Sequence, residues 1–301
     1  PMYHNGPFIW GMLGLFKGNT ITITDRFDAE ETLSLIETHQ VDTVYMVPTM
    51  MHRIWNLSQQ KKSSFNLKTL KTIWHLASPC PVWLKHKYIE WLGADVVWEL
   101  YGGTEGTGFT TISGHEWLQH VGSVGKAKPD ECEIKIFDEN GKELPPNNIG
   151  EVFIRPALGP GTTYYYIGAE SKILGEGWES LGDMGYLDED GYLYLTDRRT
   201  DMILSGGANI YPAEVEAAID LCPGVRSSAV IGLPDDDLGN KIHAIVDTSD
   251  QTVSEENLLN HLSKHLVRYK IPRTIEFVAN PVRDDAGKVR RSALRADRLK
   301  N

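Results

Sequence analysis

The sequence is poor in three features that would point to particular classes of protein. Its three cysteines are widely spaced and odd in number: Cys80, Cys132 and Cys222. They form neither a metal-ligand cluster nor an obvious disulfide framework, which favours a reducing, cytoplasmic setting. No apolar run approaches the ~20 residues that a bilayer-spanning helix needs, so we expect no membrane span. Basic residues are outnumbered by acidic ones, 30 to 41, and the net charge of −11 argues against nucleic acid as a partner.

What is present has the composition of an ordinary globular protein. The 301 residues are 41% hydrophobic and 24% charged, and the chain is long enough for two domains. The stretch 288–300 is locally basic. It is either a solvated terminal helix or a segment that lies near the phosphates of a ligand.

The first 118 residues alternate helical and strand signals. Residues 28–39 have apolar side chains at helical spacing, with Asp28 available as the N-cap. Residues 41–47, 70–76 and 96–100 have the pattern of strands. Strands that alternate with helices predict a parallel sheet covered on both faces.

The pattern changes near Gly122, where short alternating runs separated by turns predict an antiparallel β subdomain with a hairpin at 188–191. After Arg198 the pattern is again mixed, with helices expected at 212–221 and 254–267 and strands at 227–233 and 241–247. We therefore expect an α/β protein in two domains. The large domain, 1–198, consists of an α/β subdomain (1–118) and a β-rich subdomain (119–198), and a smaller α+β domain occupies 199–301.

The most informative stretch is the Gly/Thr loop from Tyr101 to Gly108, which carries one acid and directly follows the strand at 96–100. Glycines allow the backbone to approach a phosphate closely, and loops at the carboxyl ends of buried strands are common ligand sites. Thr104 could hydrogen-bond a phosphate, and Glu105 could hold Mg²⁺ through oxygen. Glycine-rich loops are more often plain turns, so the motif needs corroboration.

Corroboration comes from further segments that follow in a fixed order: Gly150 to Val152, Gly182-Asp183, Gly185 to Arg198, Ser205 to Glu216 and Gly287 to Arg291. Together with residues 101–108, this series resembles the adenylate-forming (AMP-binding) superfamily of acyl-CoA synthetases, peptide-synthetase adenylation domains and beetle luciferases. The resemblance covers nearly the whole chain.

One family motif is missing. Members carry a Thr/Ser/Gly-rich phosphate loop that ends in Pro-Lys-Gly, well upstream of the motif that residues 1–7 resemble. This chain has no such loop and begins on Pro1. We interpret it as the C-terminal portion of a longer enzyme and expect the chain alone to be impaired in adenylation.

The resemblance assigns nucleotide contacts. Asp183 would accept hydrogen bonds from the ribose diol, although an Asp after Gly beside a hairpin is otherwise a routine turn residue. Arg198 would be a second ribose or phosphate contact. Tyr101, beside Gly102, would stack on adenine, with the turn Ala77-Ser78-Pro79 as the other wall. The alternative for Tyr101 is a buried structural tyrosine.

The resemblance also assigns catalytic and substrate residues. Lys288 matches the catalytic lysine, which would act with Thr104 and Glu105 by stabilising charge between the acyl carboxylate and the α-phosphate. Its Asp-Ala-Gly-Lys context departs mildly from the commoner Thr-Gly-Lys, and a lone Lys would ordinarily be a solvated surface charge. His4 would line the acyl pocket, although a lone His is more often a packing residue.

Two more assignments concern the second half of the reaction. Gly206 and Gly207 would lie beside the CoA pantetheine, the alternative being a simple turn between strand and helix. Arg199 and Thr200 would form the interdomain hinge, although the family usually has Asp or Lys where this chain has Thr200.

These assignments imply an AMP-forming acyl-CoA synthetase, an acid–thiol ligase that uses ATP, Mg²⁺ and coenzyme A. Its substrate would be an apolar carboxylic acid of the fatty, aryl or steroid/bile-acid type. A carrier-protein-loading adenylation domain and a non-catalytic nucleotide-binding fragment remain alternatives. Self-association into a homo-oligomer stays open.

Overall fold

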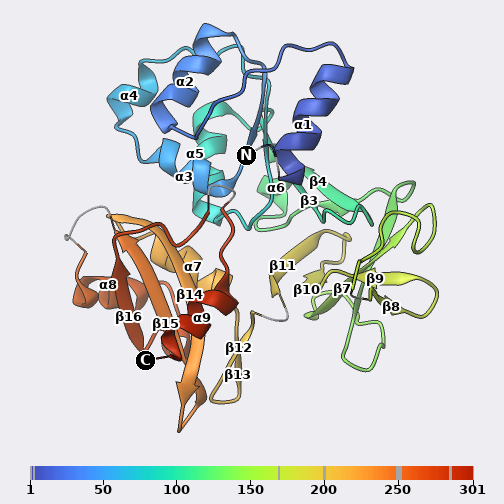
Figure 1. Ribbon diagram of the computed structural model, residues 1–301, viewed down its shortest axis with the longest axis vertical. Coiled ribbons are helices and arrows are strands. Elements are labelled where there is room, and N and C mark those ends of the chain that lie inside the picture. Colours follow the sequence, from blue (N-terminus) through green and yellow to red (C-terminus); the bar gives the residue numbers. More distant parts are fainter. Residues whose placement is uncertain are drawn as a thin grey trace. The chain divides into compact units, whose positions relative to one another are not determined.

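The computed structural model describes residue 2 and residues 4–168, 170–198, 201–248, 253–284 and 287–300, without the side chains of Asp197 and Arg198. The chain divides into two compact units (Figure 1). The first consists of Pro1–Leu195 with Asp285–Gly287, and the second of Thr196–Asp284 with Lys288–Asn301. The division falls between Leu195 and Thr196, close to the boundary expected at 199.

A five-stranded sheet forms the centre of the α/β part of the first unit, in the order β1-β2-β3-β4-β5. Its strands are β1 (Thr43–Met46), β2 (Thr72–His75), β3 (Val97–Gly102), β4 (Phe109–Ser113) and β5 (Lys126–Ala127). The first three are parallel, as predicted, whereas β4 and β5 continue the sheet in antiparallel fashion. The sequence pattern predicted the parallel strands but neither β4 nor β5, and β4 joins the sheet by pairing with β3.

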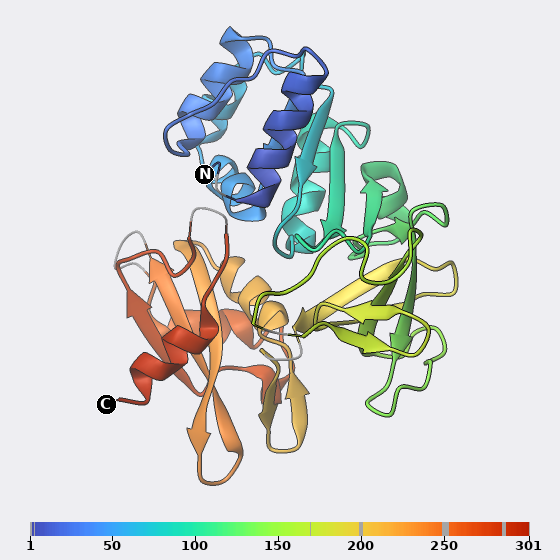
Figure 2. The same cartoon turned by 45° about the vertical axis from the view of Figure 1, so that its right-hand side comes forward.

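Six helices accompany this sheet in the described residues: α1 (Asn5–Phe16), α2 (Ala29–Thr38), α3 (Pro48–Trp55), α4 (Gln59–Ser63), α5 (Val82–Leu92) and α6 (Gly114–Gln119) (Figure 2). The prediction for α2 is confirmed, since the Asp28 side chain accepts the Glu31 N–H at 2.8 Å. The core between helices and sheet is apolar and includes Leu33, Ile54, Ile73, Leu84, Val97 and Trp117.

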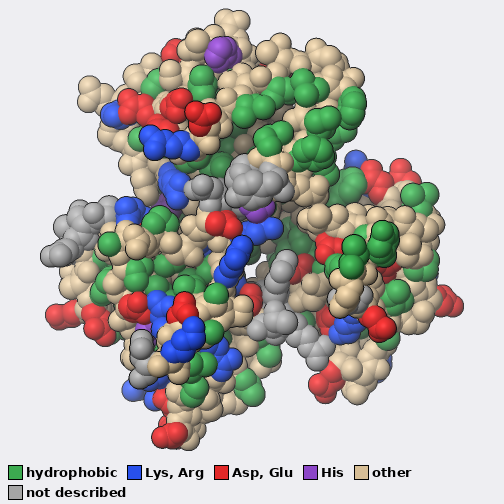
Figure 3. All heavy atoms as spheres, viewed as in Figure 1, with side chains coloured by type: hydrophobic (Ala, Val, Ile, Leu, Met, Phe, Trp, Pro, Cys, Tyr) green, Lys and Arg blue, Asp and Glu red, His purple; other side chains and the backbone are tan. Residues whose placement is uncertain are grey.

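Helix α1 differs from the others because none of its residues is buried. Its apolar side chains form a hydrophobic patch on the surface of the first unit (Figure 3). Phe8 is 49% exposed and Ile9 38% exposed, whereas Trp10 packs against Tyr45 of β1 with ring centroids 5.7 Å apart.

A buried ion pair lies beneath β3. The Lys85 Nζ of α5 donates to the Glu99 Oε2 of β3 at 2.6 Å, and the two residues are only 1% and 5% exposed. His75 of β2 lies beside them, with its Nε2 3.8 Å from the same oxygen. Burial, together with the Lys85 charge, lowers the pKa of His75 and keeps this imidazole neutral. Burial raises the pKa of Glu99, and the charge and hydrogen bond of Lys85 oppose that rise.

The β-rich part of the first unit is a six-stranded sheet, as the turn pattern predicted. It contains β6 (Cys132–Phe137), β7 (Gly150–Pro156), β8 (Lys172–Leu174), β9 (Trp178–Ser180), β10 (Asp183–Leu187) and β11 (Leu193–Arg198). Strand β7 pairs antiparallel with β6, β9 and β10. The expected hairpin is present, with the Gly191 N–H donating to the Asp188 carbonyl at 3.1 Å.

The second unit is built around the three-stranded sheet β14-β15-β16. Its elements are β12 (Ile203–Ser205), β13 (Ala208–Ile210), α7 (Pro212–Asp220), β14 (Val225–Asp235), β15 (Gly239–Thr248), α8 (Glu255–Leu262), a 3₁₀ turn (Arg268–Lys270), β16 (Thr274–Val278) and α9 (Arg291–Arg298). Helix α7 begins with Pro212 in its first turn, as predicted. Helix α8 ends five residues earlier than the predicted 267. Among the described helices of the two units, none is long and apolar enough to cross a membrane.

The buried pair gives a stability prediction. Lys85→Met leaves the Glu99 carboxylate buried without its cation, so we expect a loss of about 3–5 kcal/mol in the free energy of unfolding. The matched control on the same helix is Lys87→Met, which removes an exposed pair with Glu90 and should cost less than about 1 kcal/mol. Urea titrations followed by tryptophan fluorescence measure both.

The loss in Lys85→Met should shrink as the pH falls, because a protonated Glu99 no longer needs a cation partner. Equal stabilities of the two variants at pH 7.5 would show that the pair does not hold β3 in place.

Candidate functional site

The predicted adenine and phosphate residues lie where β2 and β3 end. These strands are neighbours and parallel, so their carboxyl ends meet at one edge of the sheet. The turn Ala77-Ser78-Pro79 follows β2, and the glycine loop follows β3. Strand β3 runs two residues further than predicted, because Tyr101 and Gly102 pair with Thr110 and Phe109 of β4.

The turn after β2 has an unusual backbone. Ala77 lies in the left-handed region with φ +76°, which few residues other than glycine adopt. Such strained positions concentrate at sites that contact ligands. Ala77 and Pro79 are exposed and Ser78 is half-buried, so the turn presents its backbone at the sheet edge, as expected for one wall of a binding site.

A hydrogen bond joins the predicted adenine and ribose residues. The Tyr101 hydroxyl donates to the Asp183 Oδ2 at 2.7 Å, across 82 positions of sequence. Tyr101 is the next-to-last residue of β3 in the α/β sheet, and Asp183 is the first residue of β10 in the β-rich sheet. Both side chains are half-buried. The structure thus brings into contact two residues that the family resemblance assigns to the nucleotide.

The turn that carries the candidate phosphate and metal residues is short and closed. The Gly106 N–H donates to the Gly103 carbonyl at 3.2 Å, and Thr104 between them is exposed. A Cβ on Gly103 would lie 2.3 Å from the Leu181 Cδ1 and 2.7 Å from the Glu105 Oε2. Glycine at 103 therefore allows the Glu105 carboxylate to fold close over the backbone.

Glu105 has a partner that the sequence reasoning missed. The Tyr166 hydroxyl donates to the Glu105 Oε1 at 2.9 Å. Partial burial and the Glu105 carboxylate raise the pKa of Tyr166 to about 12, so it stays a donor at neutral pH. The run of three tyrosines at 164–166 in a Gly/Thr-rich loop was the signal that could have marked this residue.

The surroundings of Glu105 fit a Mg²⁺ ion that a nucleotide brings with it. Within the described residues, its Oε2 accepts no hydrogen bond, and no group of three His, Cys, Asp or Glu side chains could hold a metal by itself. Mg²⁺ usually takes one or two carboxylates and completes its shell with phosphates and water. A single carboxylate on an exposed turn suits that mode of binding.

Lys288 belongs to the second unit and lies on a closed loop. Its N–H donates to the Asp284 Oδ1 at 2.8 Å, and the Asp284 N–H donates to the Lys288 carbonyl at 3.0 Å. The side chain is exposed. The backbone of Lys288 is thus held by Asp284, and its side chain is open to solvent.

Gly206 and Gly207 form the two-residue turn between β12 and β13, where Ser205 pairs with Ala208. Both have positive φ, +56° and +81°, which is the conformation that a type I′ hairpin turn demands. The turn therefore lies within a hairpin and not between a strand and a helix. This geometry explains both glycines without a ligand.

The remaining candidates are His4, Arg198, Arg199 and Thr200. His4 precedes α1, where its carbonyl accepts the Phe8 N–H at 3.1 Å. Helix α1 packs on β1, two strands away from β3. Arg198 ends β11, but its side chain lies outside the described residues, as do Arg199 and Thr200.

Comparison with known proteins decides the family. Residues 1–166 match the family of AMP-binding enzymes, and residues 214–288 match the C-terminal domain of AMP-binding enzymes. The chain belongs to the AMP-binding enzyme family. The resemblance inferred from the ordered motifs is therefore confirmed.

Curated relatives of this AMP-binding enzyme include ligases for different acids. The 2-succinylbenzoate–CoA ligase of Bacillus licheniformis is 34% identical over 306 residues, covering 98% of this chain and 60% of the relative. The fatty acid–acyl-carrier-protein ligase ScoC of Streptomyces coeruleorubidus is 31% identical over 307 residues, covering 98% of this chain and 57% of the relative. The chain thus spans about three-fifths of the length of these relatives.

A solved structure has the same fold. The o-succinylbenzoate CoA synthetase MenE of Bacillus subtilis, in complex with the acyl-adenylate intermediate OSB-AMP, matches with a TM-score of 0.82 and 29% identity. The match covers 98% of this chain and 59% of that one. The same synthetase also matches in complexes with AMP and with ATP and a magnesium ion, with TM-scores of 0.81 and 0.80.

The Tyr101–Asp183 contact predicts how nucleotide binding responds to mutation. Asp183→Ala should weaken AMP binding by at least about 10-fold, because hydrogen bonds to a charged group contribute ~1.5–3 kcal/mol. Tyr101→Phe should reduce the affinity for AMP less than Asp183→Ala does. The double variant should bind no more weakly than Asp183→Ala, since the hydroxyl that Phe lacks acts through the Asp183 carboxylate. AMP is the probe because it needs no phosphate loop, and calorimetry measures its affinity.

The control is Asp190→Ala, an exposed acid of the hairpin between β10 and β11, which should bind AMP as the unmodified chain does. Equal affinities of Asp183→Ala and Asp190→Ala would remove Asp183 from the site.

Proposed function

We propose that the complete protein is an AMP-forming acyl-CoA synthetase. Carboxylate and ATP would give an acyl-adenylate and pyrophosphate, and the CoA thiol would then attack the acyl carbonyl and release AMP. The observation that supports the proposal is the Tyr101–Asp183 hydrogen bond, because it joins the ring that would stack on adenine to the carboxylate that would accept from the ribose, in a member of the AMP-binding enzyme family.

Each residue would have one task. Tyr101, Gly102 and the turn Ala77-Ser78-Pro79 would hold adenine, and Asp183 with Arg198 would hold the ribose. Thr104 would donate to a phosphate oxygen, and the Glu105 carboxylate would orient the metal–nucleotide complex. Mg²⁺ would supply positive charge against the triphosphate.

Lys288 would complete the first half-reaction. Its ammonium would stabilise the charge that develops between the attacking carboxylate and the α-phosphate, a task for a fixed cation in a site that excludes water. His4 would line the acyl pocket. Gly206 and Gly207 would border the path of the pantetheine in the second half-reaction, and the domain 199–301 would turn about Arg199 and Thr200 between the two steps.

The substrate would be an apolar acid, of the aryl or fatty type that the names of the relatives suggest, or of the steroid or bile-acid type. CoA is the proposed acceptor. The similarity to ScoC, named as a ligase for an acyl-carrier protein, supports a carrier protein as the second candidate acceptor. A cytoplasmic enzyme without nucleic-acid partners fits the composition. A homo-oligomer and a non-catalytic nucleotide-binding fragment are the remaining alternatives.

Exchange of labelled pyrophosphate into ATP tests the proposal. It would be measured across a panel of fatty, aryl and steroid acids on two proteins: this chain, and the chain preceded by the family's phosphate-loop segment, called here the extended protein. We expect acid-dependent exchange by the extended protein and at least about 10²-fold less by the chain alone, because the loop provides much of the charge stabilisation.

Adding CoA or an acyl-carrier protein then separates the two acceptors. The proposal fails if no acid supports exchange by the extended protein, and equal exchange by both proteins would show that the phosphate loop is dispensable.

A further inference from the structure

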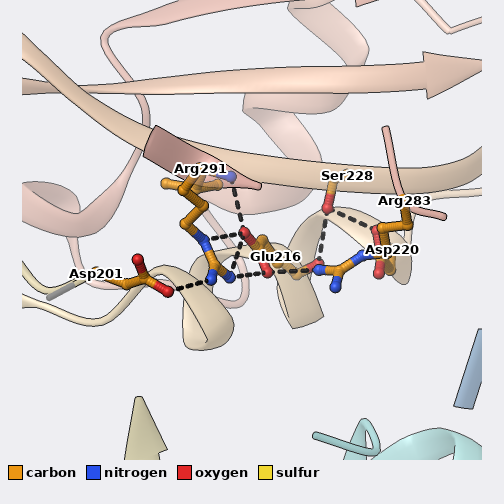
Figure 4. Close-up of polar contacts among 7 residues, drawn as sticks. Asp201, Glu216, Asp220, Ser228, Arg283 and Arg291 are labelled. Atoms are coloured by element: carbon orange, nitrogen blue, oxygen red, sulfur yellow. Dashed lines mark hydrogen bonds and ion pairs between the residues drawn. The ribbon is translucent and has the colours of Figure 1, made fainter. Parts of the chain in front are cut away.

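One buried carboxylate in the second unit has no task in the proposed function. Glu216 of α7 is 3% exposed and lies between two arginines, Arg283 and Arg291 (Figure 4). These arginines flank the loop that carries Lys288: Arg283 immediately precedes Asp284, and Arg291 is the first residue of α9.

The carboxylate is hydrogen-bonded at both oxygens. The Arg283 Nη2 donates to Oε2 at 2.6 Å, and the Arg291 Nη2 lies 2.8 Å from the same oxygen. Arg291 also donates to Oε1 through Nε at 3.2 Å and Nη2 at 2.9 Å, and the Val230 N–H donates to Oε1 at 2.8 Å. Hydrogen bonds between ionised groups are about twice as strong as neutral ones. Glu216 is thus fixed both to β14 and to the two arginines.

The consequence for the loop is geometric. Its two ends, Arg283 and Arg291, attach to a single carboxylate, and the backbone between them is closed by the mutual hydrogen bonds of Asp284 and Lys288. Glu216 itself stands on a rigid element, since its neighbours Val215 and Ile219 on α7 belong to the apolar core. The position of Lys288 is therefore set relative to α7 and not only by its own short loop.

Further contacts extend the cluster. The Arg291 Nη1 donates to the Asp201 Oδ2 at 2.8 Å, next to the segment where the hinge is expected (Figure 4). The Ser228 hydroxyl donates to the Asp220 Oδ1 at 2.7 Å, and burial raises the pKa of Asp220 to about 6 against the opposing charge of Arg283. The cluster thus consists of alternating acids and bases, with Glu216 at its centre.

We propose that Glu216 is a positioning residue for Lys288, acting through Arg283 and Arg291, which together hold the two ends of the loop that carries Lys288, called here the lysine loop. The inference deepens the proposed function and rests on it, since Lys288 serves the adenylation step there. A purely structural role would instead affect the whole second unit and both half-reactions equally.

Hydrogen exchange on the chain itself tests the clamp without any activity. Glu216→Gln removes the charge that holds the two arginines. We expect the amides of residues 284 and 287–290 to exchange at least about 10-fold faster, because their loop opens locally, while those of β14 and β15 keep their rates. The matched control is Glu214→Gln, the same change two residues earlier on the same helix. The Glu214 carboxylate pairs with Lys270 at 2.6 Å. This control should leave the loop unchanged.

Half-reaction kinetics on the extended protein test the consequence. Glu216→Gln should slow adenylate formation at least about 10-fold, whereas conversion of supplied acyl-adenylate to thioester should stay within about threefold, since misplaced catalytic groups lose rate only in their own step. Lys288→Ala should give the same split, and Glu216→Asp should recover part of the loss. If Glu216→Gln does not fold, Arg283→Gln replaces it, because Glu216 then keeps Arg291.

The outcomes distinguish the positioning role of Glu216 from the proposed catalytic role of Lys288. Unchanged exchange of the lysine loop, or equal losses in both half-reactions, overturns the positioning role. If the loop loosens but Lys288→Ala adenylates normally, Glu216 still holds the loop and the proposed role of Lys288 fails. That last result also overturns the inference as stated, because no catalytic group would be positioned.

Discussion

The hydrogen bond from the Tyr101 hydroxyl to the Asp183 carboxylate is the contact on which the candidate site depends. It joins the end of β3 to the start of β10, two strands of different sheets. Each strand is fixed by its own partners, β3 by β2 and β4, and β10 by β7. Once both ends are fixed, the turn after β2 and the loop after β3 face the same edge. The proposed nucleotide site lies at that edge, where loops at the carboxyl ends of parallel strands commonly bind ligands.

Buried ion pairs support the candidate residues in both units. In the first, Lys85 and Glu99 anchor the strand that ends in Tyr101. In the second, Glu216 holds both ends of the loop that carries Lys288. Buried charges are weak evidence for stability, because their desolvation offsets much of their attraction. They do fix geometry, since a buried charge tolerates few arrangements of its partners. In this protein both buried ion pairs support segments that carry residues of the proposed site.

The sequence predicts the local parts of this arrangement well. The Asp28 cap, the strands β1 to β3, the hairpin at 188–191 and the start of α7 all follow from side chains close to one another in the chain. The ordered motifs identify the family. Strand β4 was not predicted, although its Phe, Thr and Ile residues favour a strand, and its place in the sheet depends on pairing with β3. The glycines at 206 and 207 predict a turn but not that it closes a hairpin.

The supporting contacts could not be predicted because they join residues far apart in the chain. Glu216 meets Arg283 and Arg291 across 67 and 75 positions, and Tyr166 meets Glu105 across 61. No periodicity or spacing in the sequence encodes such pairs. From the sequence alone, any acidic side chain could be paired with any basic one. These pairs can be identified only in the folded structure, where water is excluded around them and each charged side chain has one set of partners.

The central claim is that this protein activates a carboxylate by forming an acyl-adenylate, and isotope transfer tests it most directly. The extended protein would be given an acid labelled with ¹⁸O in both carboxylate oxygens, together with ATP and the acceptor thiol. A carboxylate oxygen that attacks the α-phosphorus stays with AMP when the thiol takes the acyl group. The account predicts one ¹⁸O atom in each AMP and none in pyrophosphate, measured by mass spectrometry. AMP that forms with thioester but contains no ¹⁸O would contradict it.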